Sequence, residues 1–181
     1  MSLFAEKGFA ATGLREIADR AGVSLGNIYN HFKNKDELFQ HIFNPGALVA
    51  SLSDTFYELA EDFPFNIDRL ILSIKKTIDA NRALFKLIFI DLIEFEGKNT
   101  DQMIEYFIQT GRDIFKKQLE DRSRMGTLKK LDYEFFIRFF VITTISFFAS
   151  STMLPSVKTK KYSDERIAAM LSEVTLTGIR A

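Results

Sequence analysis

The chain has 181 residues, of which 46% are hydrophobic, so it can bury a core in one domain or in two small ones. Basic and acidic residues balance at 24 each, and the formal net charge at pH 7 is zero. The absence of cysteine excludes disulfides, thiolate catalysis and cysteine-ligated metals. We expect a cytoplasmic protein, because no secretory signal is recognisable.

The first clearly bounded element is a short helix that begins near residue 13. We predict Thr12 as its N-cap, because a threonine hydroxyl can accept hydrogen bonds from backbone N–H groups one turn into a helix. Apolar side chains then recur at the spacing of one helix face, at Leu14, Ile17, Ala18 and Ala21. Gly22 follows, where a left-handed conformation can end the helix.

A second short helix follows at once. Ser24 is its predicted N-cap, Val23 is expected to pack beneath the turn, and Ile28 is expected to anchor the helix against the first one. This spacing satisfies the helix-turn-helix motif. The motif alone is weak evidence, since helical corners of every function share it.

The side chains of the second helix favour contact with DNA bases. Gly26 would let the helix sink into the major groove, since it has no side chain. Asn27 and Asn30 can each offer a donor and an acceptor to adenine N6 and N7. Leu25 could pack on a thymine methyl group.

Other side chains suit phosphate oxygens, which position a protein on DNA without identifying the bases. Tyr29, Lys35 and the hydroxyls of Thr12 and Ser24 are the predicted contacts, and His31 is equally suited to packing or to a phosphate. Residues 1–43 hold five basic and five acidic side chains, so any basic surface must come from their placement. Non-specific affinity for DNA should therefore be modest.

The residues after Ile28 extend the pattern beyond a helical corner. They resemble the signature of the TetR family, in which a tyrosine and an aromatic pair end the recognition helix and a lysine opens the next helix beside the DNA backbone. The matching residues here are Tyr29, His31, Phe32, Lys33, Lys35 and Leu38. Residues 3–9 resemble the end of helix 1 in that family, whose helix 1 normally starts two or more turns earlier, so we expect a truncated helix 1.

The resemblance is specific over residues 3–43 and architectural beyond them. It implies an all-α fold with an N-terminal three-helix helix-turn-helix DNA-binding domain over residues 1–43. A C-terminal helical domain for ligand binding and dimerisation would occupy residues 44–181. Double-stranded DNA with a palindromic operator sequence, bound by a homodimer, is the implied partner.

Helical periodicity continues to the end of the chain. A helix should begin near Lys35 and break at residues 44–46, which are Asn-Pro-Gly. Further helices are predicted over 47–61, 67–80, 82–95, 100–122 and 132–150, the last of these capped by Asp132. A loop over 155–162 precedes a final helix capped by Ser163.

The predicted helix over 132–150 is apolar on nearly every side, so it must be covered on every side. Its most apolar run, residues 139–149, is too short to cross a bilayer, which favours a buried helix over a membrane contact. The final helix is its natural partner. The resemblance implies a four-helix dimer interface, with candidate residues Phe148, Ile167, Met170, Leu171 and Val174.

Nineteen phenylalanines and no tryptophan predict an interior that could accept a small, mainly apolar effector. Asp91 and Arg138 are rare charged residues in apolar helices. We favour a structural partner or extension of the side chain to solvent for each, and the alternative is that either binds the polar end of the ligand. The ligand would favour a dimer with wrongly spaced recognition helices, and the helix from Lys35 would carry the change. The candidate pocket residues are Phe85, Phe89, Asp91, Tyr106, Phe107 and Arg138.

Two other classes of protein were weighed. An enzyme is disfavoured, because the only histidines are His31 and His41 and no phosphate loop, Glu-x-x-His pair or nucleophile elbow is present. We therefore predict no catalytic residue, no metal and no cofactor. A helical lipophile-binding protein without DNA-binding activity is the second alternative, favoured by the neutral charge and the truncated start. A ligand-responsive repressor is the preferred interpretation.

Overall fold

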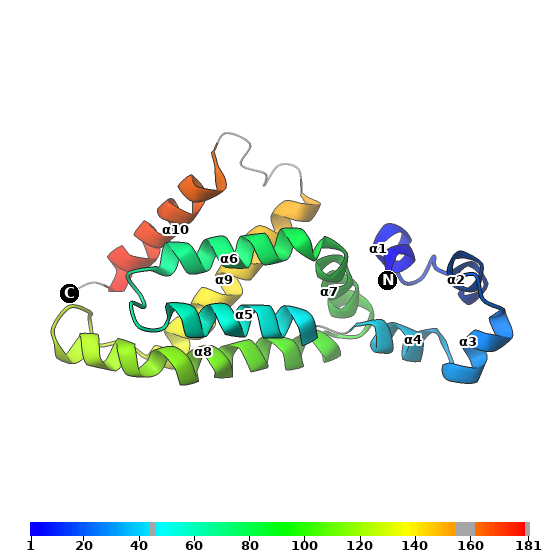
Figure 1. Ribbon diagram of the computed structural model, residues 1–181, viewed down its shortest axis with the longest axis horizontal. Coiled ribbons are helices and arrows are strands. Elements are labelled where there is room, and N and C mark those ends of the chain that lie inside the picture. Colours follow the sequence, from blue (N-terminus) through cyan, green and yellow to red (C-terminus); the bar gives the residue numbers. More distant parts are fainter. Residues whose placement is uncertain (44–45, 155–161, 180–181) are drawn as a thin grey trace. The chain divides into compact units, whose positions relative to one another are not determined.

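The computed structural model of the protein is described for residues 1–43, 46–154 and 162–179. The described residues form helices and no strands, which confirms the predicted all-α class. In chain order (Figure 1) the helices are α1 (Ser2–Lys7), α2 (Leu14–Ala21), α3 (Leu25–His31), α4 (Lys35–Ile42), α5 (Gly46–Leu59), α6 (Ile67–Ala80), α7 (Arg82–Glu94), α8 (Lys98–Arg124), α9 (Tyr133–Met153) and α10 (Asp164–Ile179).

The predicted helix boundaries hold to within a few residues. The helix predicted over 67–80 matches α6, and Asp132 caps α9 as expected by accepting a hydrogen bond from the Phe135 N–H at 3.0 Å. α9 continues to Met153, three residues further than predicted. Of the predicted break at 44–46, residues 44 and 45 lie outside the described part, and α5 begins at Gly46. Residues 155–161 of the predicted loop also lie outside it.

The chain divides into two compact units. Unit 1 comprises Met1–Gly46 together with Arg82–Gln102, and unit 2 comprises Ala47–Asn81 together with Met103–Ala181. By its packing, the segment Arg82–Gln102 thus belongs with the N-terminal residues, although the sequence placed it in the C-terminal domain. The division of function between residues 1–43 and 44–181 stays a prediction.

Four phenylalanine rings, which we call the aromatic cluster, explain why unit 1 contains this later segment. They are Phe4, Phe9, Phe39 and Phe95. The Phe95 ring lies 4.9 Å from the rings of both Phe9 and Phe39, centroid to centroid, and it follows directly on α7. α7 itself packs against α1. Rings at these separations attract one another beyond the apolar area that they bury.

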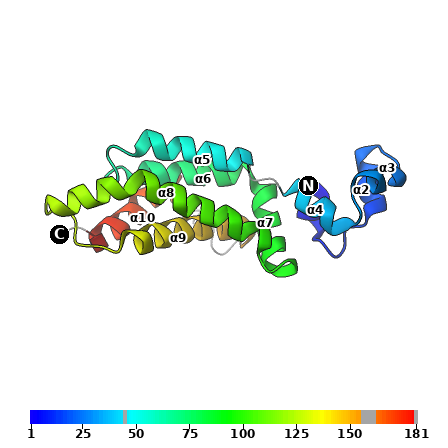
Figure 2. The ribbon, with the colours of Figure 1, turned by 90° about the horizontal axis from the view of Figure 1, so that it is seen from below.

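Unit 2 is built around α6, which packs against both α9 and α10. α5 lies beside α6 in both views (Figures 1 and 2), and the hydroxyl oxygens of Thr55 and Ser73 are 3.0 Å apart. Lys75 of α6 contacts Asp79 in its own helix and Asp164 of α10, the latter at 3.3 Å. Burial opposes the charge on Lys75, but its hydrogen bonds to Asp79 and Asp164 outweigh that effect and raise its pKa.

Within one chain α9 is covered on one face and open to solvent on another, so the predicted coverage on every side would need a second chain. Phe136, Phe140 and Phe148 are buried in unit 2. The opposite face leaves Phe135, Phe139 and Ile142 with 67%, 53% and 43% of their surface exposed. The stretch Tyr133–Ser151, which extends beyond the apolar run 139–149, is long and apolar enough to cross a membrane by length and composition alone. Its packing against α6 is that of a core helix.

Candidate nucleic-acid interface

The turn between α2 and α3 has the predicted geometry. Gly22 adopts the left-handed conformation with φ of 69°, and its N–H donates to the Asp19 carbonyl at 3.2 Å. Buried Ala18, Ile28 and Leu38 join α2, α3 and α4 in a small core. A second shell of half-buried apolar side chains packs against these three: Leu14, Ile17, Leu25, Phe32 and Ile42. The helix-turn-helix is therefore a packed unit and not an isolated corner.

The start of α3 is held by its own cap. The Ser24 Oγ accepts a hydrogen bond from the Asn27 N–H at 3.1 Å, which confirms the cap predicted from sequence. Since this hydroxyl is exposed, it can still contact a phosphate while it caps the helix.

One face of α3 is open to solvent. Gly26, Asn27, Tyr29, Asn30 and His31 are all exposed. A Cβ atom added at Gly26 would meet only the Ser24 Oγ, at 3.9 Å, so nothing in the protein requires glycine there. The absence of a side chain at residue 26 therefore demands another explanation, and close approach of the helix to a ligand supplies one.

Three expectations for this region were wrong. Gly13, not Thr12, is the N-cap of α2, and Thr12 is buried with its hydroxyl donating to the Gly8 carbonyl at 2.6 Å, so it cannot reach a phosphate. Leu25 packs against the small core and is not free to meet a thymine methyl. Val23 is 40% exposed and not packed beneath the turn. Sequence spacing locates these residues but does not show which way each points.

Lys35 also differs from expectation. Its ammonium donates to the backbone carbonyls of Phe9, Thr12 and Ala10, at 2.8, 3.0 and 3.4 Å. It lies 4.4 Å from the centre of the Phe9 ring as well. The cation predicted to face a phosphate is thus engaged inside unit 1. His31 is exposed, so the choice between packing and phosphate contact stays a prediction for it.

Ion pairs neutralise much of the charge on α1 and α2. Lys7 pairs with Glu16, and Arg20 pairs with Glu6 at 2.9 Å. All four side chains are at least one-third exposed, so each pair contributes little to stability. Their main effect is electrostatic, because paired cations are less available to phosphates. Lys33 remains an exposed cation beside α3.

The family description "Bacterial regulatory proteins, tetR family" matches residues 1–42, the segment that forms α1 to α4. Over these residues the chain matches the TetR family of transcriptional regulators. It is 29% identical to the regulator YhgD of Bacillus subtilis over 134 residues, which cover 72% of this chain and 69% of YhgD. It is 33% identical to the repressor KstR2 of Rhodococcus jostii over 88 residues, which cover 45% of this chain and 41% of KstR2.

A solved structure shares the fold over nearly the whole chain. FadR of Bacillus subtilis, solved in complex with stearoyl-CoA, superposes with a TM-score of 0.67 over 99% of this chain and 95% of FadR. Sequence identity is 18%, so the likeness concerns the fold alone.

Asp91, one of the two charged residues predicted in apolar helices, has a structural role. Its carboxylate is fully buried and accepts hydrogen bonds from the Thr100 N–H at 2.7 Å and from the Asn99 side chain and N–H at 2.7 and 3.1 Å. It therefore caps the start of α8, which confirms the favoured interpretation. As an anchor for a ligand, Asp91 was the wrong choice, because its acceptor positions are already occupied.

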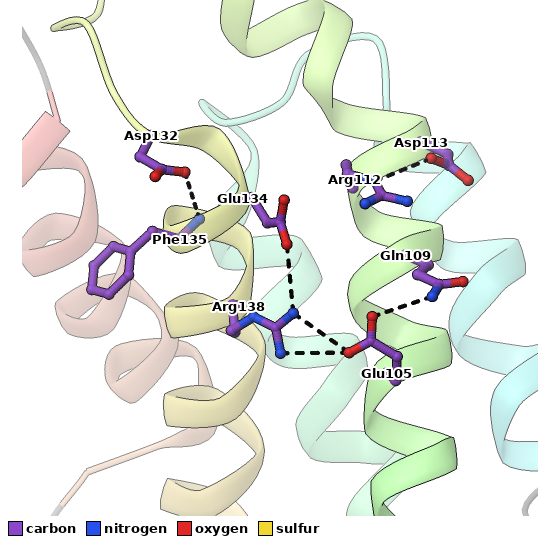
Figure 3. Close-up of polar contacts among 8 residues, drawn as sticks. All are labelled: Glu105, Gln109, Arg112, Asp113, Asp132, Glu134, Phe135 and Arg138. Carbon is purple, nitrogen blue, oxygen red and sulfur yellow. Dashed lines mark hydrogen bonds and ion pairs between the residues drawn. The ribbon is translucent and has the colours of Figure 1, made fainter.

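Arg138 has structural partners too. Its guanidinium lies 3.4 Å from the Glu105 carboxylate of α8 and 3.6 Å from Glu134 of its own helix (Figure 3). The side chain is 42% exposed, so it does not enter an apolar interior.

The remaining pocket candidates do not form one site within either unit. Phe85 is buried and Phe89 half-buried in unit 1, whereas unit 2 contains Phe107, which is buried, and Tyr106, which is 48% exposed. The effector site therefore stays a prediction without an assigned pocket. Within the described part of the chain, no three His, Asp or Glu side chains gather as metal ligands.

The candidate dimer residues divide by exposure. Phe148 and Ile167 are 2% and 6% exposed, so they belong to the core of unit 2 and were wrong as interface residues. Met170 and Leu171 are half-buried, and Val174 is 75% exposed. Sequence reasoning missed the exposed face of α9 at residues 135, 139 and 142, because the buried Phe136 and Phe140 recur at the same helical spacing.

Proposed function

We propose that this protein is a ligand-responsive transcriptional repressor that binds a palindromic DNA operator as a homodimer and inserts α3 into the major groove. The observation that carries the proposal is the exposed face of α3, which offers Gly26, Asn27 and Asn30 to solvent on a capped and packed helix. In helix-turn-helix proteins the N-terminal residues of the second helix contact base edges. The named repressor activity of the relative KstR2 supports repression over activation.

Asn27 and Asn30 would provide the sequence specificity. Residues three apart are neighbours on a helix surface, so the two amides can address adjacent base pairs. An asparagine that binds adenine N6 and N7 discriminates by about 1–3 kcal/mol. Tyr29, which is 55% exposed on the same helix, would contact phosphate and contribute equally on every sequence.

Substitution separates these roles. Asn27→Ala and Asn30→Ala should lower operator affinity while leaving affinity for random duplex unchanged, measured by fluorescence anisotropy at several salt concentrations. Tyr29→Ala is the matched control on the same helix and should weaken both duplexes alike. Equal losses on operator and random DNA for both asparagine variants would remove them from base readout.

The homodimer would form through the exposed apolar face of α9. The rings of Phe135 and Phe139 stack with their centres 6.3 Å apart, and both side chains are more than half exposed. An exposed apolar patch of this kind supports a protein–protein contact. Val174 of α10 adds a further exposed apolar side chain. A two-fold axis would present two α3 helices to half-sites spaced by about 34–36 Å, or one turn of DNA.

The effector would be a small, mainly apolar molecule. The density of phenylalanine supports this class, and the related fold of FadR accommodates stearoyl-CoA. The dimer would have two states, one with its α3 helices spaced for DNA and one with them wrongly spaced. The ligand would bind these two states with different affinity, since only a difference in affinity can shift their populations. α4 was the expected carrier of the change, and the packing of α7 on α1 offers a second route. Stearoyl-CoA added to the protein–operator complex tests the proposal: release of the duplex at micromolar ligand supports it, whereas unchanged binding argues against this ligand class.

A lipophile-binding protein without DNA-binding activity is the competing function. The zero net charge and the paired cations of α1 and α2 favour it. Selection of binding sites from fragmented genomic DNA, followed by a salt-dependent mobility shift, decides between the two. A regulator enriches one palindrome, whereas the competing function enriches none.

A further inference from the structure

The connection between α1 and α2, residues 8–13, has carbonyl groups that are satisfied by side chains. The Thr12 hydroxyl donates a hydrogen bond to the Gly8 carbonyl, and the Lys35 ammonium donates to the carbonyls of Phe9, Ala10 and Thr12. The connection is not helical, and among its carbonyls those of Phe9 and Gly13 also accept from backbone donors, the Thr12 N–H at 3.2 Å and the Ile17 N–H at 3.1 Å. The carbonyls of Gly8, Ala10 and Thr12 depend on the side chains. Buried or half-buried carbonyls without partners are rare in folded proteins, so these side chains are a requirement for this path of the backbone.

Lys35 matches this site in number of donors and in charge. An ammonium has three N–H groups, and three carbonyl oxygens lie between 2.8 and 3.4 Å from it. The face of the Phe9 ring adds a cation–π contact at 4.4 Å. The side chain is half-buried, and its backbone is held at the first turn of α4, where the Asn34 side chain accepts from the Glu37 N–H at 2.8 Å.

We propose that Lys35 is a positioning residue for DNA recognition and not a phosphate ligand. The chain enters α2 through Gly13, directly after the connection that Lys35 binds, and it leaves α3 through Phe32, three residues before Lys35. One side chain therefore ties the entry of the α2–α3 pair to its exit. This inference rests on the proposed function, because it assumes that α3 contacts DNA bases.

The two roles of Lys35 predict different salt dependence. Each phosphate contact contributes about 0.9 to the slope of log affinity against log salt, so loss of one contact per subunit flattens a dimer's slope by about 1.8. Loss of a positioning residue leaves the slope on random DNA unchanged but moves α3 out of register with the bases. We therefore expect Lys35→Met to lower the ratio of operator to random affinity at least tenfold without changing that slope.

The experiment uses the full chain, with anisotropy titrations of operator and random duplexes from low to moderate salt. Circular dichroism fixes a temperature at which every variant is folded. Lys33→Met is the matched control, because it removes the same charge from an exposed position two residues away and shows what loss of a surface cation does to the slope. Lys35→Arg keeps the charge but offers a planar fork of donors, which cannot reproduce the three-carbonyl arrangement. It should also lose operator preference, and it tests the proposal if Lys35→Met does not fold.

Two results overturn the proposal. A flatter slope with equal losses on both duplexes for Lys35→Met, together with retained affinity for Lys35→Arg, identifies a phosphate ligand. A lower melting temperature with unchanged affinities in the folded variants identifies a residue that serves stability alone. Failure of the unmutated protein to prefer any duplex would instead overturn the proposed function, so the two failures are distinguishable.

Discussion

Gly26→Ala should change the stability of the fold and the affinity for DNA in opposite directions. The added Cβ would lie 3.9 Å from its nearest neighbour, the Ser24 Oγ, which is an ordinary contact, and Gly26 does not have a positive φ. Alanine loses less conformational entropy than glycine when it folds into a helix, so the variant should be more stable by about 0.5–1 kcal/mol. For a chain of this size that corresponds to a rise in melting temperature of about 1–4 °C.

DNA binding should change in the opposite direction. If α3 enters the major groove at Gly26, the new methyl group lifts the helix from the bases and weakens the asparagine contacts beside it. We expect an operator affinity lower by about 1–3 kcal/mol, the range for a single bidentate base contact. Thermal unfolding by circular dichroism and anisotropy titration of the operator measure the two effects on one preparation.

Gly178→Ala is the control for this experiment. Residue 178 lies in α10, and an added Cβ there meets nothing within 4 Å, so the variant should fold normally and keep its operator affinity. A Gly26→Ala protein that is more stable and binds the operator as tightly as the unmutated chain would refute close approach of α3 at this position.

Two further predictions concern unit 2. Phe139→Glu places a charge on the exposed face of α9, so it should give folded monomers in light scattering and weaken operator binding. Phe148→Glu is the control, because it places the charge in the core and should unfold the protein. A Phe139→Glu protein that remains a dimer would exclude this face as the interface. The raised pKa of Lys75 means that the folded state holds this proton more tightly than the unfolded chain, so its contribution to stability is complete below the ordinary pKa of 10.5 and is lost as pH rises through the raised value. Urea unfolding at pH 9 and above pH 10.5 should show this loss, and Lys75→Met should reduce it.

Local chemistry made the helix-turn-helix predictable. Gly22 and the caps at Ser24 and Asp132 depend on residues within one helical turn, and all three have the predicted geometry. The cap predicted at Thr12 was wrong, because the adjacent Gly13 is the N-cap of α2. The Thr12 hydroxyl donates to the Gly8 carbonyl instead. Which of two adjacent residues caps a helix depends on the path of the backbone, and sequence spacing does not show that path.

Contacts between distant residues were not predictable. A structural partner was favoured for Arg138, but Glu105 could not be named from the sequence because it lies 33 residues earlier, on α8. The exposure of Phe139 and the burial of Phe136 depend on where α6 lies against α9, and a helix that is apolar on all sides carries no mark of its inner face. The candidate DNA face therefore followed mostly from the sequence, whereas the pocket and the interface did not.

The packing of the Phe95 ring makes unit 1 discontinuous in the sequence. Phe9 and Phe39 pack against a residue that the gene encodes only after α5, α6 and α7, so a transplant of α1 to α4 alone would leave that packing behind. A chimaera between two regulators would need to carry Arg82–Gln102 with the N-terminal helices. Substitutions at residues 9, 39 and 95 should likewise compensate one another, because the three rings fill one volume.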